Sequence, residues 1–237
     1  MGAGTGPGTT PVSARAHAFV DDLGAPVLSV EDHHHLSRVL RLPVGAAVTA
    51  GDGRGAWRPC RLLDGAALEV DGEVVVDLPA EPALTVAFAL VKGERPELVV
   101  QKLTEVGVDH IAPFVAERSV VRWDATKADR HAVRWRQIAR QAAMQCRRTT
   151  LPTVHAVVPF AVVAALPGAT RADLGGDPPS LSRPTLLVGP EGGWSRAEVA
   201  AGLPSVSLGP NVLRAETAAI TAGAILAAMR SGLVLNG

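Results

Sequence analysis

The chain of 237 residues contains no tyrosine, only four tryptophans and four phenylalanines, and two cysteines. With so few aromatic rings, stacking platforms are not expected to dominate any recognition of nucleobases. Cys60 and Cys146 fit neither the spacing of a metal site nor a disulfide framework, and no secretory signal is evident, so we expect a cytoplasmic protein. The most apolar stretches, 151–170 and 217–235, are interrupted by prolines and by Arg230 respectively, so we expect no membrane span.

The chain also has no net charge, because 23 basic and 23 acidic residues cancel. The cancellation hides an asymmetry: residues 118–148 include nine basic and two acidic side chains, a local charge of +7 that leaves −7 for the rest. A basic patch on a neutral body suits a polyanionic partner better than a small neutral one. Arginine outnumbers lysine by twenty to three, which suits bidentate phosphate contacts but fits a bias in genome composition equally well.

The composition along the chain predicts three parts. Residues 1–13 are mostly Gly, Thr, Pro and Ser, as in a disordered tail. Between 14 and 79, short apolar runs separated by Asp-Gly pairs predict a small β-rich domain. Pro79 and Pro82 then mark a boundary, and over 83–237 apolar strands alternate with helices, which is typical of a parallel α/β fold.

Within the α/β part, the periodicity of apolar residues predicts strands at 84–91, 110–116, 185–188 and 206–208, and helices at 94–106, 126–147 and 215–229. The pattern Thr126…Asp129 predicts the cap of the longest helix, and Ser195 with Glu198 predicts a capping box for a short one. Residues 167–184 are rich in turn formers and predict a mobile loop.

Two of the predicted strands end in similar loops, VGPEGGWS at 188–195 and LGPNVLRAETA at 208–218. Parallel sheets bind ligands at the carboxyl ends of their strands, and glycine leaves main chain uncovered there. Either loop alone would be explained as a tight turn, but the pair, with the acidic residues Glu191 and Glu216, favours a cofactor pocket. A flat heteroaromatic ring could be read there by main-chain donors and acceptors. The dinucleotide fingerprint and the phosphate loop are absent, so the sequence gives little support for a dinucleotide or a triphosphate.

Further runs with a distinctive sequence are VKGERPELVVQKLTEVGVDHIAPFVAERSV (91–120), QCRRTTLPTV (145–154) and HLSRVLRLPVG (35–45). Together with the two loops, they resemble the small-subunit ribosomal RNA methyltransferase E family of the SPOUT class. The resemblance implies a PUA-like β-barrel RNA-binding domain at 14–79 and a SPOUT α/β methyltransferase domain, tied in a trefoil knot, at 83–237. It also implies S-adenosylmethionine as the methyl donor and a homodimer through the knotted domain. The implied reaction is methylation of uridine N3 in 16S rRNA, near the decoding centre of the assembled small subunit.

The resemblance also implies which residues of the two loops bind the donor: Val188, Gly189, Glu191, Gly192, Gly193, Leu208, Gly209, Leu213 and Arg214. Arg214 is the candidate for stabilising negative charge on the uracil, and Glu191 for accepting the N3 proton or balancing the sulfonium. The alternatives are a salt bridge from Arg214 to Glu216 or Glu191, and a solvent-exposed turn carboxylate at Glu191. The chemistry requires no metal.

The candidates for binding RNA are mainly arginines of the +7 segment and of the N-terminal domain: Arg15, Arg38, Arg41, Lys102, Arg118, Arg122, Arg140, Gln145, Arg147 and Arg148. A solvated helix face would explain many of the same charges. Two other functions stay open: a non-catalytic RNA-binding ribosome-assembly protein that keeps the fold, and a metabolite-binding α/β enzyme unrelated to RNA.

Overall fold

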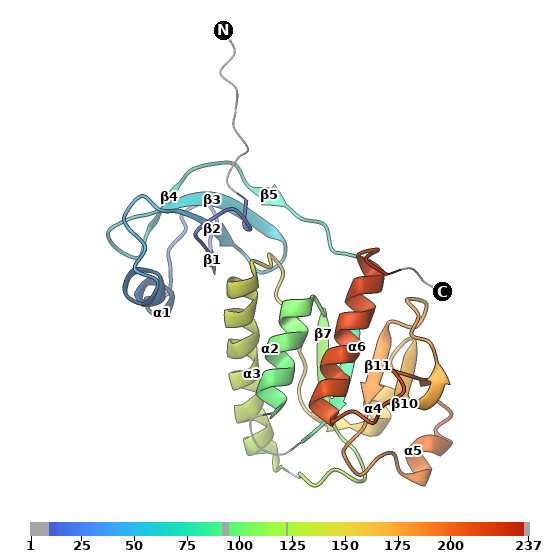
Figure 1. Ribbon diagram of the computed structural model, residues 1–237. Helices are drawn as coiled ribbons and strands as arrows, with labels where there is room; N and C mark the ends of the chain where they lie inside the picture. The colour runs from blue at the N-terminus through green and yellow to red at the C-terminus, as the bar shows by residue number, and fades with distance from the viewer. Residues whose placement is uncertain (1–9, 92–94, 122, 235–237) are drawn as a thin grey trace. The chain divides into compact units, whose positions relative to one another are not determined.

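A computed structural model describes residues 10–91, 95–121 and 123–234 (Figure 1). Contacts divide this chain into two compact units. Unit 1 contains the residues up to Pro79 together with Ala143–Leu151, and unit 2 contains Ala80–Ala142 and the residues from Pro152 onward. Residues 1–9 of the predicted disordered tail lie outside the described residues, whereas 10–13 form a turn in which the Ala14 amide donates to the Thr10 carbonyl.

Unit 1 is built on a five-stranded sheet, which confirms the predicted β-rich character. Its strands are β1 (Ala16–Phe19), β2 (Ala47–Gly51), β3 (Ala56–Leu62), β4 (Leu68–Val70) and β5 (Val75–Val76). The order is β1-β2-β3-β4, with β5 also paired to β3, and only β1 and β2 run parallel. The expected PUA-like barrel is not confirmed, because β1 and β4 end this path and the described strands do not close. Two short helices, α1 (Val30–His34) and the π-helix η1 (His35–Val39), lie between β1 and β2 in sequence.

Unit 2 is organised around a parallel sheet, as the alternation of strands and helices predicts. The sheet order is β12 (Ser205–Val206), β10 (Ala169–Asp177), β11 (Thr185–Val188), β6 (Thr85–Ala89), β7 (His110–Val115) and β8 (Thr153–Val154), with β9 (Val158–Pro159) also on β7. Every pairing is parallel. The helices are α2 (Arg95–Val106), α3 (Ala125–Cys146), α4 (Phe160–Ala164), α5 (Arg196–Ala200) and α6 (Ala215–Arg230), and the last residues of α3, from Ala143, belong to unit 1. None of the described helices is long and apolar enough to cross a membrane.

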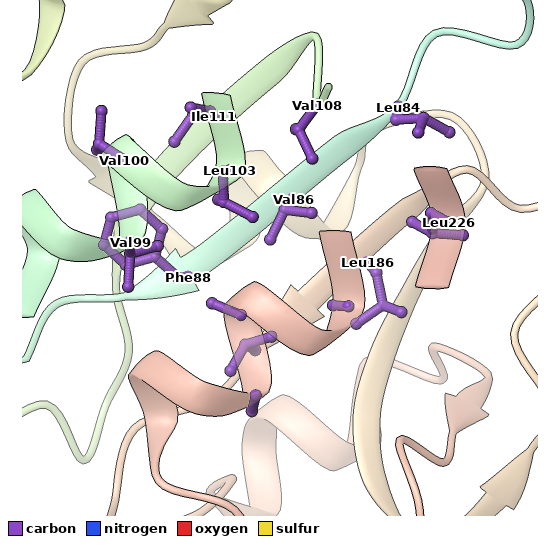
Figure 2. Packing of buried hydrophobic residues seen from close by; sticks show 14 of the residues in the cluster. Leu84, Val86, Phe88, Val99, Val100, Leu103, Val108, Ile111, Leu186 and Leu226 are labelled. Carbon is purple, nitrogen blue, oxygen red and sulfur yellow. The ribbon is translucent and has the colours of Figure 1, made fainter. Parts of the chain in front are cut away.

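Strand β6 is buried on both faces, which explains why its sequence is an unbroken apolar run. Val86 and Phe88 pack into a cluster with residues of α2 and α6, among them Leu103 and Leu226 (Figure 2). The alternate residues Ala87 and Ala89 face a second cluster with β7 and α4. Burying one large apolar side chain stabilises a fold by about 1.5–3 kcal/mol, so the two clusters stabilise the sheet that carries the loops at its edge.

Two local predictions about unit 2 were wrong. The Asp124 carboxylate, and not Thr126, caps helix α3, since its Oδ1 accepts from the Lys127 amide at 2.8 Å. Residues 169–177 of the predicted mobile loop form strand β10, because Ala169–Arg171 pair in register with Thr185–Leu187. For β10, pairing with the neighbouring strand overrode the local composition, whereas the cap of α3 differs by a local choice between two nearby polar residues.

Helix α6 is fixed at its carboxyl end by Arg230. The guanidinium forms an ion pair with Asp109 and donates to the carbonyls of Gly107 at 2.6 Å and Pro82 at 3.2 Å. A cation in the last turn also complements the helix dipole. Because Arg230 fixes the carboxyl end of α6, it also fixes the position of the first turn of this helix, at the opposite edge of the sheet.

Candidate functional site

A cavity of about 240 Å³ lies where strands β10, β11 and β12 give way to loops. Its lining comes from β10, from both glycine loops and from the start of α6: Ala172, Asp173, Leu174, Val188, Gly189, Pro190, Glu191, Gly193, Trp194, Leu208, Gly209, Asn211, Val212, Leu213, Ala215 and Ala218. The two loops that the sequence singled out therefore line one cavity. Its walls combine apolar side chains with bare main chain, as small-molecule sites often do.

Most of the predicted donor-binding residues line this cavity: Val188, Gly189, Glu191, Gly193, Leu208, Gly209 and Leu213. Gly192 and Arg214 are not among the lining residues. A Cβ atom at Gly192 would lie 3.3 Å from the Cβ of Arg118, so this glycine faces Arg118. Arg214 is exposed and is the N-cap residue of α6, with ψ of 152°.

Loop 189–194 is tied to the sheet by Trp194. The indole Nε1 donates to the Ala172 carbonyl at 2.9 Å, and the ring stacks on Phe114 with the planes 4° apart. A Cβ atom at Gly189 would lie 2.9 Å from the Trp194 ring, so only glycine leaves room for this packing. The Arg118 guanidinium adds a hydrogen bond of 3.1 Å to the Gly192 carbonyl.

The same loop is secured at its end by a buried carboxylate, Glu198. The predicted capping box with Ser195 is confirmed, since the Ser195 amide donates to Oε2 of Glu198 at 2.8 Å and the Ser195 hydroxyl accepts from the Glu198 amide at 3.1 Å. Oε1 accepts a further bond of 2.8 Å from the Glu117 amide. This last link joins segments 81 residues apart, so local sequence spacing gives no signal for it.

Loop 207–214 has fewer side-chain anchors, although the Ser207 amide donates to the Asp177 carbonyl of β10 at 2.9 Å. The Ser207 hydroxyl accepts from the Gly209 amide at 3.3 Å and donates to the Gly209 carbonyl at 3.2 Å. Gly209 has φ of +127°, and a Cβ atom there would meet nothing within 4 Å. Asn211 is exposed and Val212 is 84% exposed. The main chain of this loop is therefore uncovered where it borders the cavity.

Two acidic residues of the loop motifs share one arginine that sequence reasoning missed. Nη1 of Arg95, in the first turn of α2, lies 3.0 Å from Oε1 of Glu191, and its Nε lies 3.6 Å from Oε1 of Glu216. The predicted alternative, a salt bridge from Arg214 to either carboxylate, is not found among the described residues. Oε2 of Glu216 is buried and has no hydrogen-bond partner in the described part of the chain.

The RNA-binding candidates are distributed over both units. In unit 1, Arg15, Arg38 and Arg41 are exposed, and the Arg147 guanidinium donates to the Arg15 carbonyl at 2.7 Å. Two further candidates complete this group: Gln145, which is exposed, and Arg148, whose Nε donates to Oγ1 of Thr150 at 3.1 Å.

In unit 2, Arg118 is exposed, Arg140 is half-buried, and Lys102 is paired with Glu105 at 2.7 Å. Arg122 lies outside the described residues. Within residues 10–91, 95–121 and 123–234, no group of three or more His, Cys, Asp or Glu side chains could hold a metal ion.

Comparison with known proteins links this arrangement to a family. The model of the RNA methyltransferase domain matches residues 79–227. Ribosomal RNA small subunit methyltransferase E of Mycobacterium tuberculosis is 33% identical over 224 residues, which are 85% of this chain and 86% of the relative. The Bacillus subtilis protein of the same name is 31% identical over 229 residues, 84% of this chain and 88% of the relative.

A solved structure agrees with the sequence relatives. Ribosomal RNA small subunit methyltransferase E from Neisseria gonorrhoeae, bound to S-adenosyl methionine, superposes with a TM-score of 0.76 at 27% identity. The match covers 90% of this chain and 97% of that one. The family expected from the loop motifs is confirmed: the chain belongs to the ribosomal RNA small subunit methyltransferase E family.

Proposed function

We propose that this chain is an S-adenosylmethionine-dependent methyltransferase that methylates N3 of a uridine in 16S rRNA, near the decoding centre. Its family membership supports methylation of small-subunit ribosomal RNA. The observation that carries the proposal is that both glycine loops line the same cavity, at the carboxyl edge of a parallel sheet. That edge is where α/β sheets bind their ligands.

The residues of the cavity fit the proposed donor. Val188, Leu208 and Leu213 supply apolar contacts for an adenine ring, and the open space at Gly209 lets the ring edge approach the main chain of the second loop. S-adenosylmethionine would supply the methyl group from its sulfonium. Because loop 189–194 is already fixed by its contacts, binding such a ligand would include little entropic cost of ordering the loop.

Methylation of uracil N3 requires loss of the N3 proton and leaves negative charge on the carbonyl oxygens of the base. Arg214 is exposed at the start of α6, beside the lining residues Leu213 and Ala215, where its guanidinium can stabilise that charge. Glu191 lines the cavity with its carboxylate held by Arg95. It can accept the N3 proton by exchanging its bond to Arg95 for one to the base.

The remaining parts of the proposal concern the partners. We assign the RNA-binding candidates of both units to contacts with the rRNA backbone, with unit 1 as the RNA-binding, PUA-like part. They are Arg15, Arg38, Arg41, Lys102, Arg118, Arg122, Arg140, Gln145, Arg147 and Arg148. We also propose a trefoil knot in unit 2, a homodimer through that knotted unit, and action in the cytoplasm on the assembled small subunit.

Mass mapping of 16S rRNA from cells that lack the protein tests the proposed reaction. We expect the loss of one base methyl, restored when purified protein and S-adenosylmethionine are added to the unmethylated subunits. Naked rRNA serves as the comparison substrate. An unchanged methylation pattern would reject the enzyme, and RNA binding without donor binding would favour a non-catalytic assembly protein.

A further inference from the structure

Asp173 lines the cavity, and neither the loop motifs nor the proposed chemistry uses it. Among the described lining residues, Asp173 and Glu191 are the two with charged side chains, and Glu191 is paired with an arginine from outside the cavity. Asp173 comes from strand β10, in the segment whose composition predicted a loop. The loop motifs therefore gave no indication that Asp173 lines the cavity.

The backbone around Asp173 forms a bulge. Ala172 pairs with Val206 of β12, and Asp177 pairs with the same Val206, so residues 173–176 leave the ladder between them. Gly176 makes this return possible, because a Cβ atom there would lie 2.6 Å from the main chain of Ser205. Bulges are often found beside functional sites, where they redirect a side chain. Here the bulge places Asp173 and Leu174 against the cavity.

The carboxylate of Asp173 is oriented but not saturated. Oδ2 forms an ion pair with Nη1 of Arg171, and Oδ1 accepts from the Leu174 amide at 3.0 Å. A carboxylate has roughly four acceptor positions, so about two remain. The Asp173 side chain is 42% exposed whereas that of Arg171 is 13% exposed, so the acid is the accessible member of the pair.

We propose that Asp173 binds the methyl donor by accepting hydrogen bonds from its ribose hydroxyls or its ammonium group. Arg171 is the positioning residue that holds the carboxylate. The inference rests on the proposed function, because it takes S-adenosylmethionine as the ligand. The sulfonium is not the assigned partner: its charge disappears during transfer, so a carboxylate bound to it would stabilise the reactant more than the transition state. The hydroxyls and the ammonium persist in the product, S-adenosylhomocysteine.

Calorimetric titration of Asp173→Asn with S-adenosylmethionine and with S-adenosylhomocysteine tests the assignment. We expect both affinities to fall by about tenfold, the effect of losing one hydrogen bond to a charged group. Asp177→Asn is the matched control, because it makes the same change on the same strand outside the lining residues. It should bind both compounds like the wild type.

Arg171 is mostly buried, so Asp173→Asn leaves a guanidinium without its ion-pair partner and could unfold the chain. The double variant Arg171→Gln/Asp173→Asn removes both charges and should show the same loss of affinity, with circular dichroism to check that each variant is folded. Titration with 5′-methylthioadenosine, which keeps the ribose but lacks the amino acid, separates the two sources. If Asp173→Asn binds 5′-methylthioadenosine more weakly than the wild type, Asp173 contacts the ribose hydroxyls. If it binds this compound equally well, Asp173 contacts the ammonium group.

Wild-type affinity for both compounds in the folded variants would overturn the assignment, and so would a loss confined to S-adenosylmethionine, which would indicate the sulfonium. Failure of the wild-type protein to bind either compound would instead reject the proposed function itself. The titrations therefore distinguish the two failures.

Discussion

The two loops that line the cavity are similar in sequence but are held very differently. Loop 189–194 is fixed by Trp194, by the guanidinium of Arg118 and by the buried Glu198 at its end. Loop 207–214 is joined to β10 by one main-chain bond, from the Ser207 amide to the Asp177 carbonyl at 2.9 Å, and Leu208 and Leu213 pack against the core. In the described part of the chain its side-chain hydrogen bonds are the local ones between Ser207 and Gly209. A shared glycine motif thus specifies where the main chain is bare, whereas long-range side-chain contacts decide how rigid it is.

The difference suggests a division of labour in the proposed reaction. A fixed wall preserves the shape of a donor site between turnovers, since a preorganised site costs little ordering on binding. A lightly held loop with exposed Val212 and Arg214 can adapt to a second, larger substrate. Equivalent changes in the two loops should therefore have unequal effects.

Truncation of the side chain that anchors the first loop should have the largest effect. We expect Trp194→Ala to lower the free energy of unfolding by about 3 kcal/mol, because it removes the stacking on Phe114, the bond to Ala172 and apolar burial. In the second loop, Val212→Ala should change it by less than about 0.5 kcal/mol. Urea denaturation measures both, and equal losses would contradict the contrast between the loops.

Removal of the cation from the second loop should affect the reaction and spare the fold. We expect Arg214→Ala to lower the single-turnover rate of methyl transfer by about 100-fold, the usual effect of losing one group that stabilises an oxyanion. The melting temperature should not change, because the side chain is exposed. Arg196→Ala on α5 is the matched control and should leave the rate unchanged. An unchanged rate for Arg214→Ala would show that another group stabilises the charge on the base.

A side chain at Gly209 should obstruct the cavity. We expect Gly209→Val to weaken donor binding by about tenfold, since the added group projects from bare main chain that lines the cavity. Gly202→Val separates obstruction from strain: both glycines have positive φ, +127° and +76°, and open space for a Cβ atom, but Gly202 is not a lining residue. Both variants should lose stability, and calorimetry should detect weaker binding only for Gly209→Val.

Loss of the arginine that pairs with both acidic residues should have the smallest effect. The pair of Arg95 with Glu191, exposed by 43% and 41%, contributes less than about 1 kcal/mol, and the contact with the mostly buried Glu216 is long, at 3.6 Å, so we expect Arg95→Ala to cost about 1 kcal/mol in all. Arg61→Ala, which breaks the similarly exposed pair with Asp71, should cost about as much. A large loss of donor affinity in Arg95→Ala would show that the first loop depends on this ion pair and not on Trp194.

The sequence predicted the parts of the fold that depend on local periodicity. The apolar run at 84–91 became the doubly buried strand β6, and the helix predicted at 126–147 became α3, which contributes Trp135 and Ala139 to the core. It was also predictable that the two glycine loops would lie together at one site, because the carboxyl ends of parallel strands share one edge of the sheet. Each of these inferences uses only residues that are neighbours in sequence or in strand order.

Apart from the cap of α3, where Asp124 contacts Lys127 three residues along the chain, the parts that escaped prediction depend on contacts between distant segments. Arg95 meets Glu191 across 96 residues, and Glu198 meets Glu117 across 81. Strand β10 forms despite its turn-forming composition because β11 and β12 supply its hydrogen bonds. Gly192 fits the motif as well as Gly189 does, yet only the fold determines that it faces Arg118.

Unit 1 is not continuous in sequence, which constrains the order in which the protein can be completed. Its core includes Ala143 and Met144, and the Leu151 amide donates to the Gly53 carbonyl at 2.8 Å. While the ribosome is still making the protein, the first 79 residues emerge long before these partners exist. A fragment cut at Pro79 would lack part of its own interior, so the amino-terminal unit can mature only after translation has passed Leu151.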